Sequence, residues 1–276
     1  MKKLTVALVQ TDPGPDKEAN VSRALELVAG AAAAGADLVA LPETFHFRGP
    51  NEARREAAEP IPGPLSERLS AAAKEHGVYL LGGSFNELHD DAADPRTYNT
   101  SQLFGPDGTL LAKYRKVHLF DAFIGGKVRA MESSRNRPGD RAVVADTGFG
   151  RVGLTICYDL RFPELYRVLA QAGATLIFAP SNFAERTGRD HWEVLIRSRA
   201  IENGVYMVAP ATIGNGGTSF EAYGRSLLVD PWGTVVACAP DVEGFTLGSV
   251  DLERVDAVRA SLPSLHHVRP DAYHVR

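Results

Sequence analysis

Three stretches of the sequence bring a side chain capable of amide chemistry to an apolar, strand-like run. Glu43 follows the run in DLVALPETF, Lys116 lies within AKYRKVHLF, and Cys157 ends VGLTIC. A glutamate in an apolar cleft has a raised pKa and accepts a proton, while a lysine beside it keeps its charge and stabilises an oxyanion. With a cysteine as nucleophile, these residue types predict hydrolysis of an amide through a thioester.

The stretch after Cys157, FPELYRVLAQAG, reads as a helix. A strand that turns sharply into a helix exposes the residue at the turn at the carboxyl edge of the sheet, where ligand sites of α/β proteins lie. The unpaired N–H groups of a helix start lower the pKa of a thiol and offer donors to an oxyanion. We expect the N–H of Tyr158 to be the first of these donors.

Each of these residues also has a structural interpretation. A cysteine in an apolar strand is most often a buried filler, and we keep this interpretation for Cys238, in TVVACAP, as an inert core thiol. Glu43 also fits an acid at a helix start, and Lys116 fits a solvated basic cluster. Alternation along a strand, however, points Lys113 and Arg115 one way and Lys116 the other, so that Lys116 can face a cleft.

Histidines offer a second mechanism, as in papain-like proteases. His118 and His191 are the candidates, but no aspartate or asparagine that would orient them is evident, and HW at 191 is typical of packing at a helix start. The glutamate is therefore the favoured base. The eight histidines show no spacing typical of a metal site, so we predict no metal.

The elements that must position these residues alternate along the first third of the chain. The runs LTVALVQ (4–10), ADLVALPE (36–43) and VYLLGGSF (78–85) predict strands. The stretches EANVSRALELVAGAAAAG (18–35) and LSERLSAAAKEHG (65–77) predict helices between them. This alternation predicts an α/β sheet.

The rest of the chain adds hairpins. YNTSQLF and LLAKYRKVHLF flank GPDG, RAVVADT and RVGLTIC flank GFG, and GRSLLVD and TVVACAP flank PWG. ATLIFAP and VYMVAPA read as strands around the helix DHWEVLIRSRAIENG (190–204). The excess of strands predicts two mixed sheets packed face to face with outer helices, in a single domain over residues 1–276 whose last ~20 residues form a C-terminal tail.

The composition excludes several partners. With 276 residues, 44% of them hydrophobic, and a net charge of −4, the chain suits a soluble globular protein with no global attraction to nucleic acid or anionic membrane. No apolar run approaches a membrane span, and the run near the start is too short for a signal peptide. Two cysteines make no disulfide framework, so we expect a reducing, cytoplasmic compartment.

The segments LPETF, YRKVHLF and GLTICYDLRFPE resemble, in order and spacing, the three signature segments of the nitrilase superfamily of carbon–nitrogen hydrolases. The resemblance runs over nearly the whole chain. It includes HWEVLIRSRAIEN, VDPWGTVVA and the tail LPSLHHVRPDAY, which look most like the Nit amidase branch of deaminated-glutathione amidases and ω-amidases.

This resemblance implies a nitrilase-like αββα sandwich and a catalytic triad of Glu43, Lys116 and Cys157. A second glutamate, Glu132 in MESSRNRPGD, is implied to position the lysine and the substrate amide. The family uses no cofactor, and its protomers commonly pair through helices near the cysteine. The resemblance therefore implies a homodimer or a higher homo-oligomer.

Residues of the substrate pocket are harder to assign. The loop after ATLIFAP should lie at the same sheet edge as Cys157, and its residues are Ser181, Asn182 and Phe183. An anionic substrate needs a cationic subsite. The nearest basic candidates, one in YDLRFPE and two in the loop NFAERTGRDHW, are Arg161, Arg186 and Arg189. Arg161 is equally suited to an ion pair with Asp159.

The expected activity is hydrolysis of the carboxamide of a small acid to the acid and ammonia, with the oxyanion between Lys116 and the Tyr158 N–H. An N-carbamoyl amine hydrolase is the enzymatic alternative. A ligand-binding protein on the same fold is the non-enzymatic alternative, which loss of a triad residue would favour. No triad residue is lost here.

Overall fold

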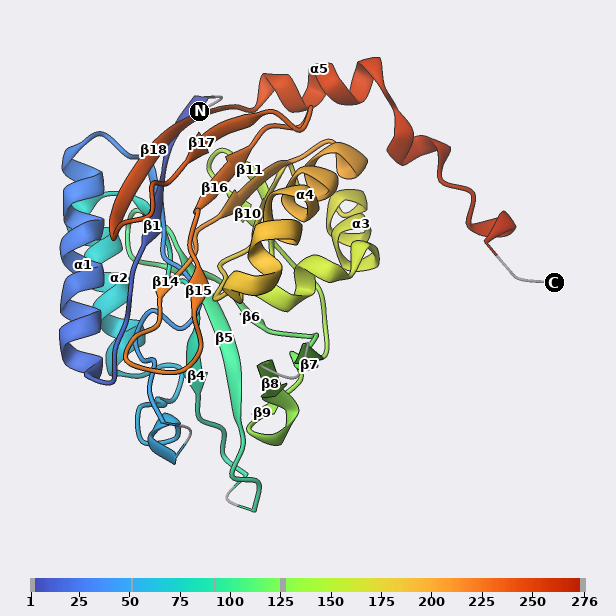
Figure 1. The fold of residues 1–276 in the computed structure, drawn as a ribbon. Helices are drawn as coiled ribbons and strands as arrows, with labels where there is room; N and C mark the ends of the chain where they lie inside the picture. The colour runs from blue at the N-terminus through green and yellow to red at the C-terminus, as the bar shows by residue number, and fades with distance from the viewer. Residues whose placement is uncertain (1–2, 51, 92, 125–127, 274–276) are drawn as a thin grey trace.

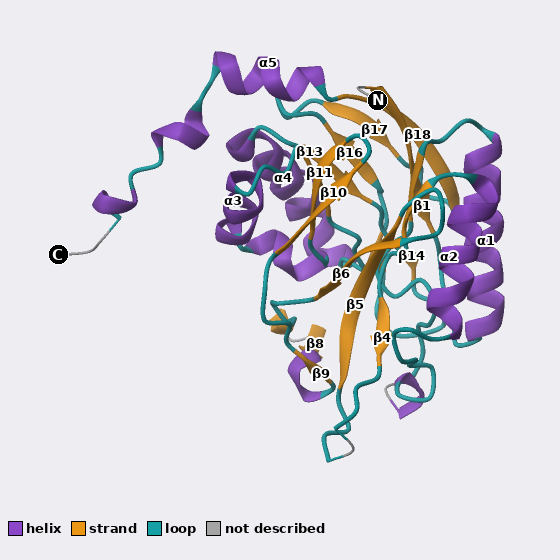
Figure 2. Cartoon of the chain, turned by 180° about the vertical axis from the view of Figure 1, so that it is seen from behind, coloured by secondary structure: helices purple, strands orange, loops and turns teal. Residues whose placement is uncertain are grey.

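Two mixed β-sheets lie face to face between two layers of helices in the computed structural model, which describes residues 3–50, 52–91, 93–124 and 128–273 (Figure 1). Helices α1 and α2 cover the outer side of one sheet, and α3 and α4 cover the outer side of the other (Figures 1 and 2). This arrangement is the predicted αββα sandwich, and the fold prediction is confirmed.

The first sheet has the strand order β18-β1-β2-β3-β5-β4, with β6 and β9 also paired to β5. Its strands are β1 (Lys3–Gln10), β2 (Leu38–Ala40), β3 (Tyr79–Leu81), β4 (Phe85–Glu87), β5 (Thr97–Phe104), β6 (Leu110–Arg115), β9 (Asn136–Arg137) and β18 (Gly244–Asp251). Strands β1, β2 and β3 run parallel to one another. Their carboxyl ends therefore meet at one edge of the sheet.

The second sheet has the order β10-β11-β12-β13-β16-β17, and β11, β12 and β13 are parallel. Its strands are β10 (Val143–Thr147), β11 (Gly150–Leu154), β12 (Leu176–Phe178), β13 (Tyr206–Ala209), β16 (Leu227–Val229) and β17 (Val235–Cys238). Two small hairpins lie outside the main sheets. They are β7 (Asp121–Ile124) with β8 (Val128–Met131), and β14 (Ile213–Gly214) with β15 (Ala222–Tyr223).

The described α-helices are α1 (Lys17–Ala33), α2 (Pro64–His76), α3 (Pro163–Gln171), α4 (Glu185–Asn203) and α5 (Glu253–Ser261). The described 3₁₀ turns are η1 (Glu52–Arg54), η2 (Glu132–Ser134), η3 (Cys157–Arg161), η4 (Ser264–His267) and η5 (Pro270–Ala272). Within the described ranges, no helix combines the length and the apolar content needed to cross a membrane.

Strand β1 shows how alternation divides the core. Val6 and Leu8 belong to the apolar cluster that also contains Val152 of β11, so they face the second sheet. Ala7 and Val9, the alternate residues, belong to the cluster formed with α1 and α2. Because both faces of β1 are covered, its centre is an unbroken apolar run from Val6 to Val9 and not an alternating pattern.

The three predicted hairpins are confirmed, since β5 with β6, β10 with β11 and β16 with β17 all pair antiparallel. The predicted loop NFAERTGRDHW is wrong, because α4 begins at Glu185 and contains Arg186 and Arg189. Its first turn is held against β15, where a Cβ on Gly188 would lie 2.4 Å from the ring of Tyr223. Only glycine permits this close approach between helix and hairpin.

Cys238 is a second correction. It is exposed at the end of β17, whereas the sequence predicted a core thiol. β17 is an edge strand with only partial burial, and its alternation turns Val236 and Cys238 outward while Val235 and Ala237 are half-buried. The prediction for Cys238 failed because the apolar sequence of this edge strand looks like that of a buried strand, although only one of its faces is covered.

The chain after α5 extends away from the two sheets in both views (Figures 1 and 2). α5 is attached by Arg259, whose Nη2 donates to Ala174 O at 2.7 Å and whose Nε donates to Gly204 O at 3.0 Å. The predicted C-terminal tail corresponds to this segment. Its last residues, 274–276, lie outside the described part of the chain.

His46 is fully buried beside Phe45, Phe47 and Phe85, and neither ring nitrogen has a partner among the described residues. Burial lowers the pKa of His46 to about 3, with the charges of Lys17 and Arg54 acting in the same direction. The ring is therefore neutral in the folded protein. An unfolded chain binds a proton at this histidine below about pH 6.5.

We predict that acid destabilises the fold partly through His46. The folded pKa lies below the unfolded value, so the stability linked to this group is fully present above about pH 6.5. As pH drops below that value, the free energy of unfolding decreases by up to about 1.4 kcal/mol per pH unit. In His46→Leu the free energy of unfolding, measured with urea from pH 7.5 to 5, should depend less on pH than in the wild type. His267→Leu, at an exposed position, should keep the wild-type slope. Equal slopes in wild type and His46→Leu would contradict this assignment.

Candidate active site

The carboxyl ends of parallel strands from both sheets converge on one cavity. Glu43 follows the end of β2 and Cys157 follows the end of β11, each in the turn that leaves its strand. Together with Lys116 and Glu132, they line a cavity of about 470 Å³. The structure therefore brings the four predicted catalytic residues together from four separate stretches of sequence.

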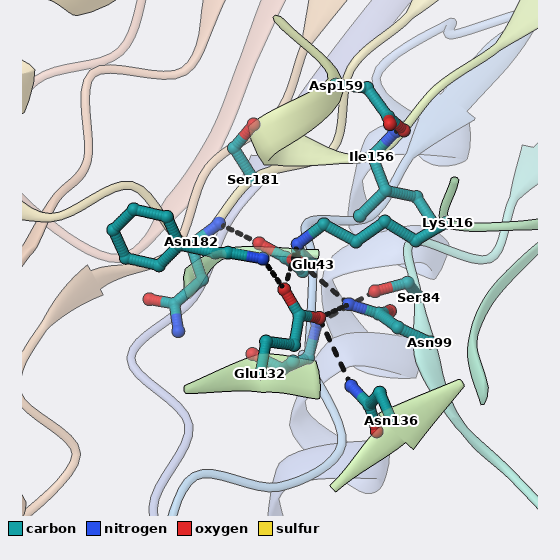
Figure 3. Close-up of polar contacts among 12 residues, drawn as sticks. Glu43, Ser84, Asn99, Lys116, Glu132, Asn136, Ile156, Asp159, Ser181 and Asn182 are labelled. Carbon is teal, nitrogen blue, oxygen red and sulfur yellow. Dashed lines mark hydrogen bonds and ion pairs between the residues drawn. The ribbon is translucent and has the colours of Figure 1, made fainter. Parts of the chain in front are cut away.

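A buried ammonium between two carboxylates forms the centre of this site (Figure 3). Lys116 Nζ lies 2.9 Å from Glu43 Oε1 and 2.9 Å from Glu132 Oε2. Burial by itself would lower the pKa of Lys116, but the charges of Glu132 and Glu43 outweigh it and hold the pKa well above its usual value. The lysine stays charged.

Strand parity explains why Lys116 reaches the cavity. It follows the last residue of β6, and its N–H donates to Asn99 O of β5 at 2.9 Å. Its neighbours Lys113 and Arg115 point away from the cavity and contact Glu87 of β4. The alternation expected from the sequence is therefore present.

Glu132 has all of its acceptor positions occupied. Oε2 accepts from Lys116 Nζ and from Phe120 N at 2.7 Å, and Oε1 accepts from Asn136 Nδ2 at 3.1 Å and Asn99 Nδ2 at 3.3 Å (Figure 3). Burial would raise the pKa of Glu132, but Lys116 and the N–H donors lower it below its usual value. A carboxylate accepts about four hydrogen bonds, so Glu132 is a fixed anion.

Glu43 is held differently. Oε1 accepts from Lys116 Nζ and from Asn99 Nδ2 at 2.9 Å, while Oε2 accepts from the backbone N–H of Asn182 at 2.7 Å. The remaining neighbour is the thiol of Cys157, which hydrogen-bonds to Glu43. Glu43 is thus the carboxylate placed to exchange a proton with the thiol.

The backbone of Cys157 has φ of 46°, a conformation uncommon for a residue other than glycine. Its N–H donates to Pro180 O at 3.0 Å, and the residue is only 8% exposed. Burial raises the pKa of the thiol well above its usual value, the charge of Glu43 raises it further, and the charge of Lys116 opposes both. The expectation that the helix start lowers this pKa is wrong, because desolvation and the carboxylate are stronger.

A second strained residue follows Glu43. Thr44 has φ of 53°, and its N–H donates to Ser84 Oγ at 3.3 Å. Backbone strain of this kind persists where surrounding contacts fix it, and it clusters at functional sites. The thiol of Cys157 and the carboxylate of Glu43 therefore both lie in turns with strained backbone, which contacts elsewhere in the structure stabilise.

Asp159 stabilises the turn that carries Cys157. Its carboxylate accepts from Tyr114 Oη at 2.7 Å, from Ile156 N at 2.8 Å, and from His118 N and Nδ1 at 3.0 and 2.8 Å. The ring of His118 stacks on Phe162 with 3.6 Å between centroids. These contacts occupy Asp159 and give His118 a structural role on η3.

Of the remaining predicted residues, some line the cavity and others do not. Asn182 lines the cavity and donates to Glu43. Ser181 Oγ donates to Ala179 O, and Phe183 packs on Trp192. Arg161 lies over the ring of Phe183 and contacts His191 Nδ1 at 3.2 Å. The ion pair with Asp159, one of its two suggested roles, is therefore replaced by other contacts among the described residues.

Neither Arg186 nor Arg189 lies among the residues that line the cavity, and the same holds for Arg161. Arg189 is mostly exposed and pairs with Glu185 one turn earlier in α4. These three arginines are therefore not placed at the cavity, although they follow the nucleophile closely in sequence.

Sequence reasoning missed the residues that orient the carboxylates. Asn99 of β5 bridges Glu43 and Glu132, and Asn136 of β9 and the N–H of Phe120 complete the contacts of Glu132. One signal was available, since Asn99 is a polar residue in the buried strand YNTSQLF. Buried polar groups need partners, and such a residue in a strand indicates a network.

The Tyr158 N–H is the second of η3, and the first N–H groups of a helical turn have no acceptor within it. Its ring packs on Phe120 and Phe162. Across the described residues, no group of three or more His, Cys, Asp or Glu side chains is arranged to hold a metal ion.

Comparison with known proteins agrees with this geometry. The family model described as carbon-nitrogen hydrolase matches residues 5–260, and the chain belongs to this family. It is 42% identical to human omega-amidase NIT2 over all of this chain and 98% of that protein. It is 43% identical to bovine deaminated glutathione amidase over 97% of this chain and 83% of that protein.

Among solved structures, Saccharomyces cerevisiae Nit3, a member of branch 10 of the nitrilase superfamily, has a TM-score of 0.86 and 36% identity. The match covers 99% of this chain and 97% of that one. The chain is therefore a hydrolase of carbon–nitrogen bonds other than peptide bonds, with amidases among its relatives.

We predict that Glu132→Gln lowers kcat about 100-fold, because it removes the charge that holds Lys116 and sets an NH₂ group against N–H donors. Glu87→Gln is the matched control, since Glu87 is equally buried and also accepts from four donor atoms, on Thr100, Lys113 and Arg115. Both variants should lose thermal stability, but only Glu132→Gln should lose turnover. A parallel loss of kcat in both would show that Glu132 acts only on the fold.

Proposed function

We propose that Cys157 attacks the carboxamide of a small acid and that the reaction passes through a thioester to release ammonia and the acid. The observation that supports this most directly is the contact between the buried thiol and Glu43, with Lys116 2.9 Å from the same carboxylate in one cavity. The names of two relatives, omega-amidase and deaminated glutathione amidase, support a linear amide as the substrate class.

Acylation begins with transfer of the thiol proton to Glu43 as the sulfur bonds to the amide carbon. The electron pair of the carbonyl moves to its oxygen, and the oxyanion lies between Lys116 and the Tyr158 N–H. An ammonium has three N–H donors, and Lys116 uses two of them on Glu43 and Glu132 within the described residues. The third is available to the oxyanion, which it stabilises in a water-poor site.

The carbon–nitrogen bond then breaks, and Glu43 returns its proton to the leaving nitrogen, so that ammonia departs and a thioester remains. In deacylation, Glu43 takes a proton from water as the water oxygen attacks the thioester. The carbon–sulfur bond breaks, the sulfur regains a proton from Glu43, and the acid is released. One residue alternates between base and acid, as a carboxylate with one free acceptor position can.

We further propose that residues 1–276 form one domain and that two protomers associate. Apolar side chains are exposed on α3, on α4 and on the segments near them: Val168, Val194, Ile201, Trp232 and Leu262. The segment after α5 extends beyond its own sheets (Figure 1). Exposed apolar patches of this kind mark protein interfaces. The free thiols of Cys157 and Cys238 are compatible with a reducing, cytoplasmic compartment.

We predict that Cys157→Ala abolishes ammonia release from a panel of monoamides, because no thioester can form, while Cys238→Ala retains it nearly in full. The panel includes an N-carbamoyl amine, which tests the enzymatic alternative. A wild-type protein that binds an amide tightly but releases no ammonia from any panel member would support a binding protein instead. Similar losses in both folded variants would refute the choice of nucleophile.

A separate prediction concerns association. Val194→Asp places a charge in the exposed apolar face of α4, where Val194 is 62% exposed, and should convert the dimer to a monomer in light scattering after size exclusion. Val242→Asp, at an equally exposed valine outside this face, should leave the mass unchanged. A wild-type monomer, or a dimer that survives Val194→Asp, would contradict the proposed interface.

A further inference from the structure

The two donors proposed for the oxyanion come from different sheets. Lys116 directly follows β6 of the first sheet, and Tyr158 lies in η3, after β11 of the second sheet. Among the described residues, no main-chain hydrogen bond connects residues 114–118 with residues 154–158. The relative placement of the two donors therefore depends on contacts made by side chains.

The carboxylate of Asp159 makes such contacts from within η3, where it is fully buried. Its Oδ2 accepts from the N–H of Ile156, the residue before the proposed nucleophile, at 2.8 Å (Figure 3). The same oxygen accepts from Tyr114 Oη at 2.7 Å, while Oδ1 accepts from His118 N and Nδ1 at 3.0 and 2.8 Å. One carboxylate thus binds the turn of the second sheet and two residues on either side of Lys116.

Tyr114 extends this connection to the residue next to Lys116. Its ring is fully buried in β6, and its Oη accepts from Val117 N at 3.3 Å while it donates to Asp159. Burial raises the pKa of Tyr114 well above its usual value, and the charge of Asp159 raises it further, so the hydroxyl keeps its proton. Val117 and His118, the two residues after Lys116, are therefore both connected to Asp159.

The main-chain hydrogen bonds of Lys116 itself do not reach the second sheet. Its N–H donates to Asn99 O at 2.9 Å, and its carbonyl oxygen accepts from Gly139 N at 2.8 Å. The connection to η3 begins only at the two residues that follow it.

Asp159 has no ion pair with a lysine or an arginine in the part of the chain that the structure describes, and its one charged-type partner is His118. Burying a carboxylate is costly unless hydrogen bonds compensate it, and about four of them saturate it. The four that Asp159 accepts all come from the two segments that carry the oxyanion donors. Its burial is therefore favourable only when both segments keep one relative placement.

We propose that Asp159 is a positioning residue of the amidase, which sets the separation between Lys116 Nζ and the Tyr158 N–H so that both reach one oxyanion. The proposal rests on the amidase function above and assigns the origin of its oxyanion geometry. Oxyanion donors act when they lie about 2.7–3.1 Å from the oxygen, and a misplacement of about 1 Å can cost on the order of 100-fold in rate.

The first test removes one connection and keeps the packing. Tyr114→Phe deletes the hydroxyl between Val117 and Asp159 but leaves the buried ring. With glutaramate as the substrate, kcat should fall about 10-fold and KM should change less than about threefold, because the misplaced donor matters only in the transition state.

Tyr166→Phe is the matched control for this substitution. Tyr166 is equally buried, and its Oη also takes part in a 2.7 Å hydrogen bond, with Thr155 Oγ1. Because this bond joins α3 to the end of β11 and does not reach the segment of Lys116, kcat should stay within about threefold of the wild type. The free energy of unfolding in urea should fall by a similar amount in both variants. A similar loss of kcat in both, or an unchanged kcat in Tyr114→Phe, would overturn the proposal.

Asp159→Asn is the stronger variant, since its NH₂ group would face N–H and O–H donors, and it should lower kcat about 100-fold. If Asp159→Asn does not fold, the comparison of the two tyrosine variants decides.

A second measurement needs no turnover. 5-Oxopentanoate carries an aldehyde where glutaramate has its carboxamide. The sulfur of Cys157 bonds to the aldehyde carbon, the carbonyl electron pair moves to the oxygen, and the thiol proton ends on that oxygen, which gives a thiohemiacetal at the oxyanion position. The Kd of this aldehyde, measured by calorimetry, should rise about 10-fold in Tyr114→Phe and less than about threefold in Tyr166→Phe.

The reaction of Cys157 with methyl methanethiosulfonate, followed in a Cys238→Ala background, reports on the thiol alone. Its rate should be the same in the wild type and both tyrosine variants, because no oxyanion forms. If the wild type releases ammonia from no monoamide, the proposed function fails, and binding of 5-oxopentanoate alone decides whether Asp159 positions the donors. The positioning role would be refuted by a wild type that binds the aldehyde no better than Cys157→Ala does. Unchanged aldehyde binding in Tyr114→Phe, or a thiol reaction that slows as much as kcat, would refute it as well.

Discussion

The buried ion cluster of Lys116 with Glu43 and Glu132 is the interaction on which the rest of the site depends. Burying three charges is costly, and removing one partner of such a pair leaves an uncompensated charge that destabilises a protein by about 3–5 kcal/mol. The cluster is therefore surrounded by donors that complete it, from Asn99, Asn136 and the backbone N–H of Phe120. Strand β5 supplies Asn99, β9 supplies Asn136, and the turn after β6 supplies Lys116, so these three elements together position the hydrogen-bond network.

Two residues beside this cluster adopt left-handed backbone conformations. Thr44, next to Glu43, and Cys157 itself have φ of 53° and 46°. Such residues cost on the order of 1–3 kcal/mol each, which contacts elsewhere must offset. For Cys157 these contacts include the hydrogen bond from its N–H to Pro180 O and the hydrogen bonds of Asp159, which hold η3 in place. The thiol and its base are thus positioned by opposite sheets whose relative placement is set by the core between them.

Local signals in the sequence, namely apolar runs, turn residues and parity within a strand, predicted the two-sheet fold and the meeting of Glu43, Lys116 and Cys157 in one cavity. Glu132 was reached only through the resemblance to the nitrilase superfamily. Elements without such signals were missed. β18 pairs antiparallel with β1 and completes the first sheet, yet its sequence GFTLGSVD is only partly buried and carries no clear alternation. Cys238 and the start of α4 were misjudged because an edge strand and a glycine-mediated contact depend on partners distant in sequence.

The electrostatics of the site also account for selective reactivity of the proposed nucleophile. Burial disfavours a thiolate at Cys157, and the charge of Glu43 outweighs that of Lys116, so the pKa of Cys157 lies well above its usual value. In the proposed mechanism, the charge does not stay on sulfur during attack but moves to the carbonyl oxygen, within reach of Lys116. The anion is thus stabilised only where the substrate supplies it. In this mechanism, a thiol that is protonated at rest and becomes nucleophilic only against a bound amide resists side reactions.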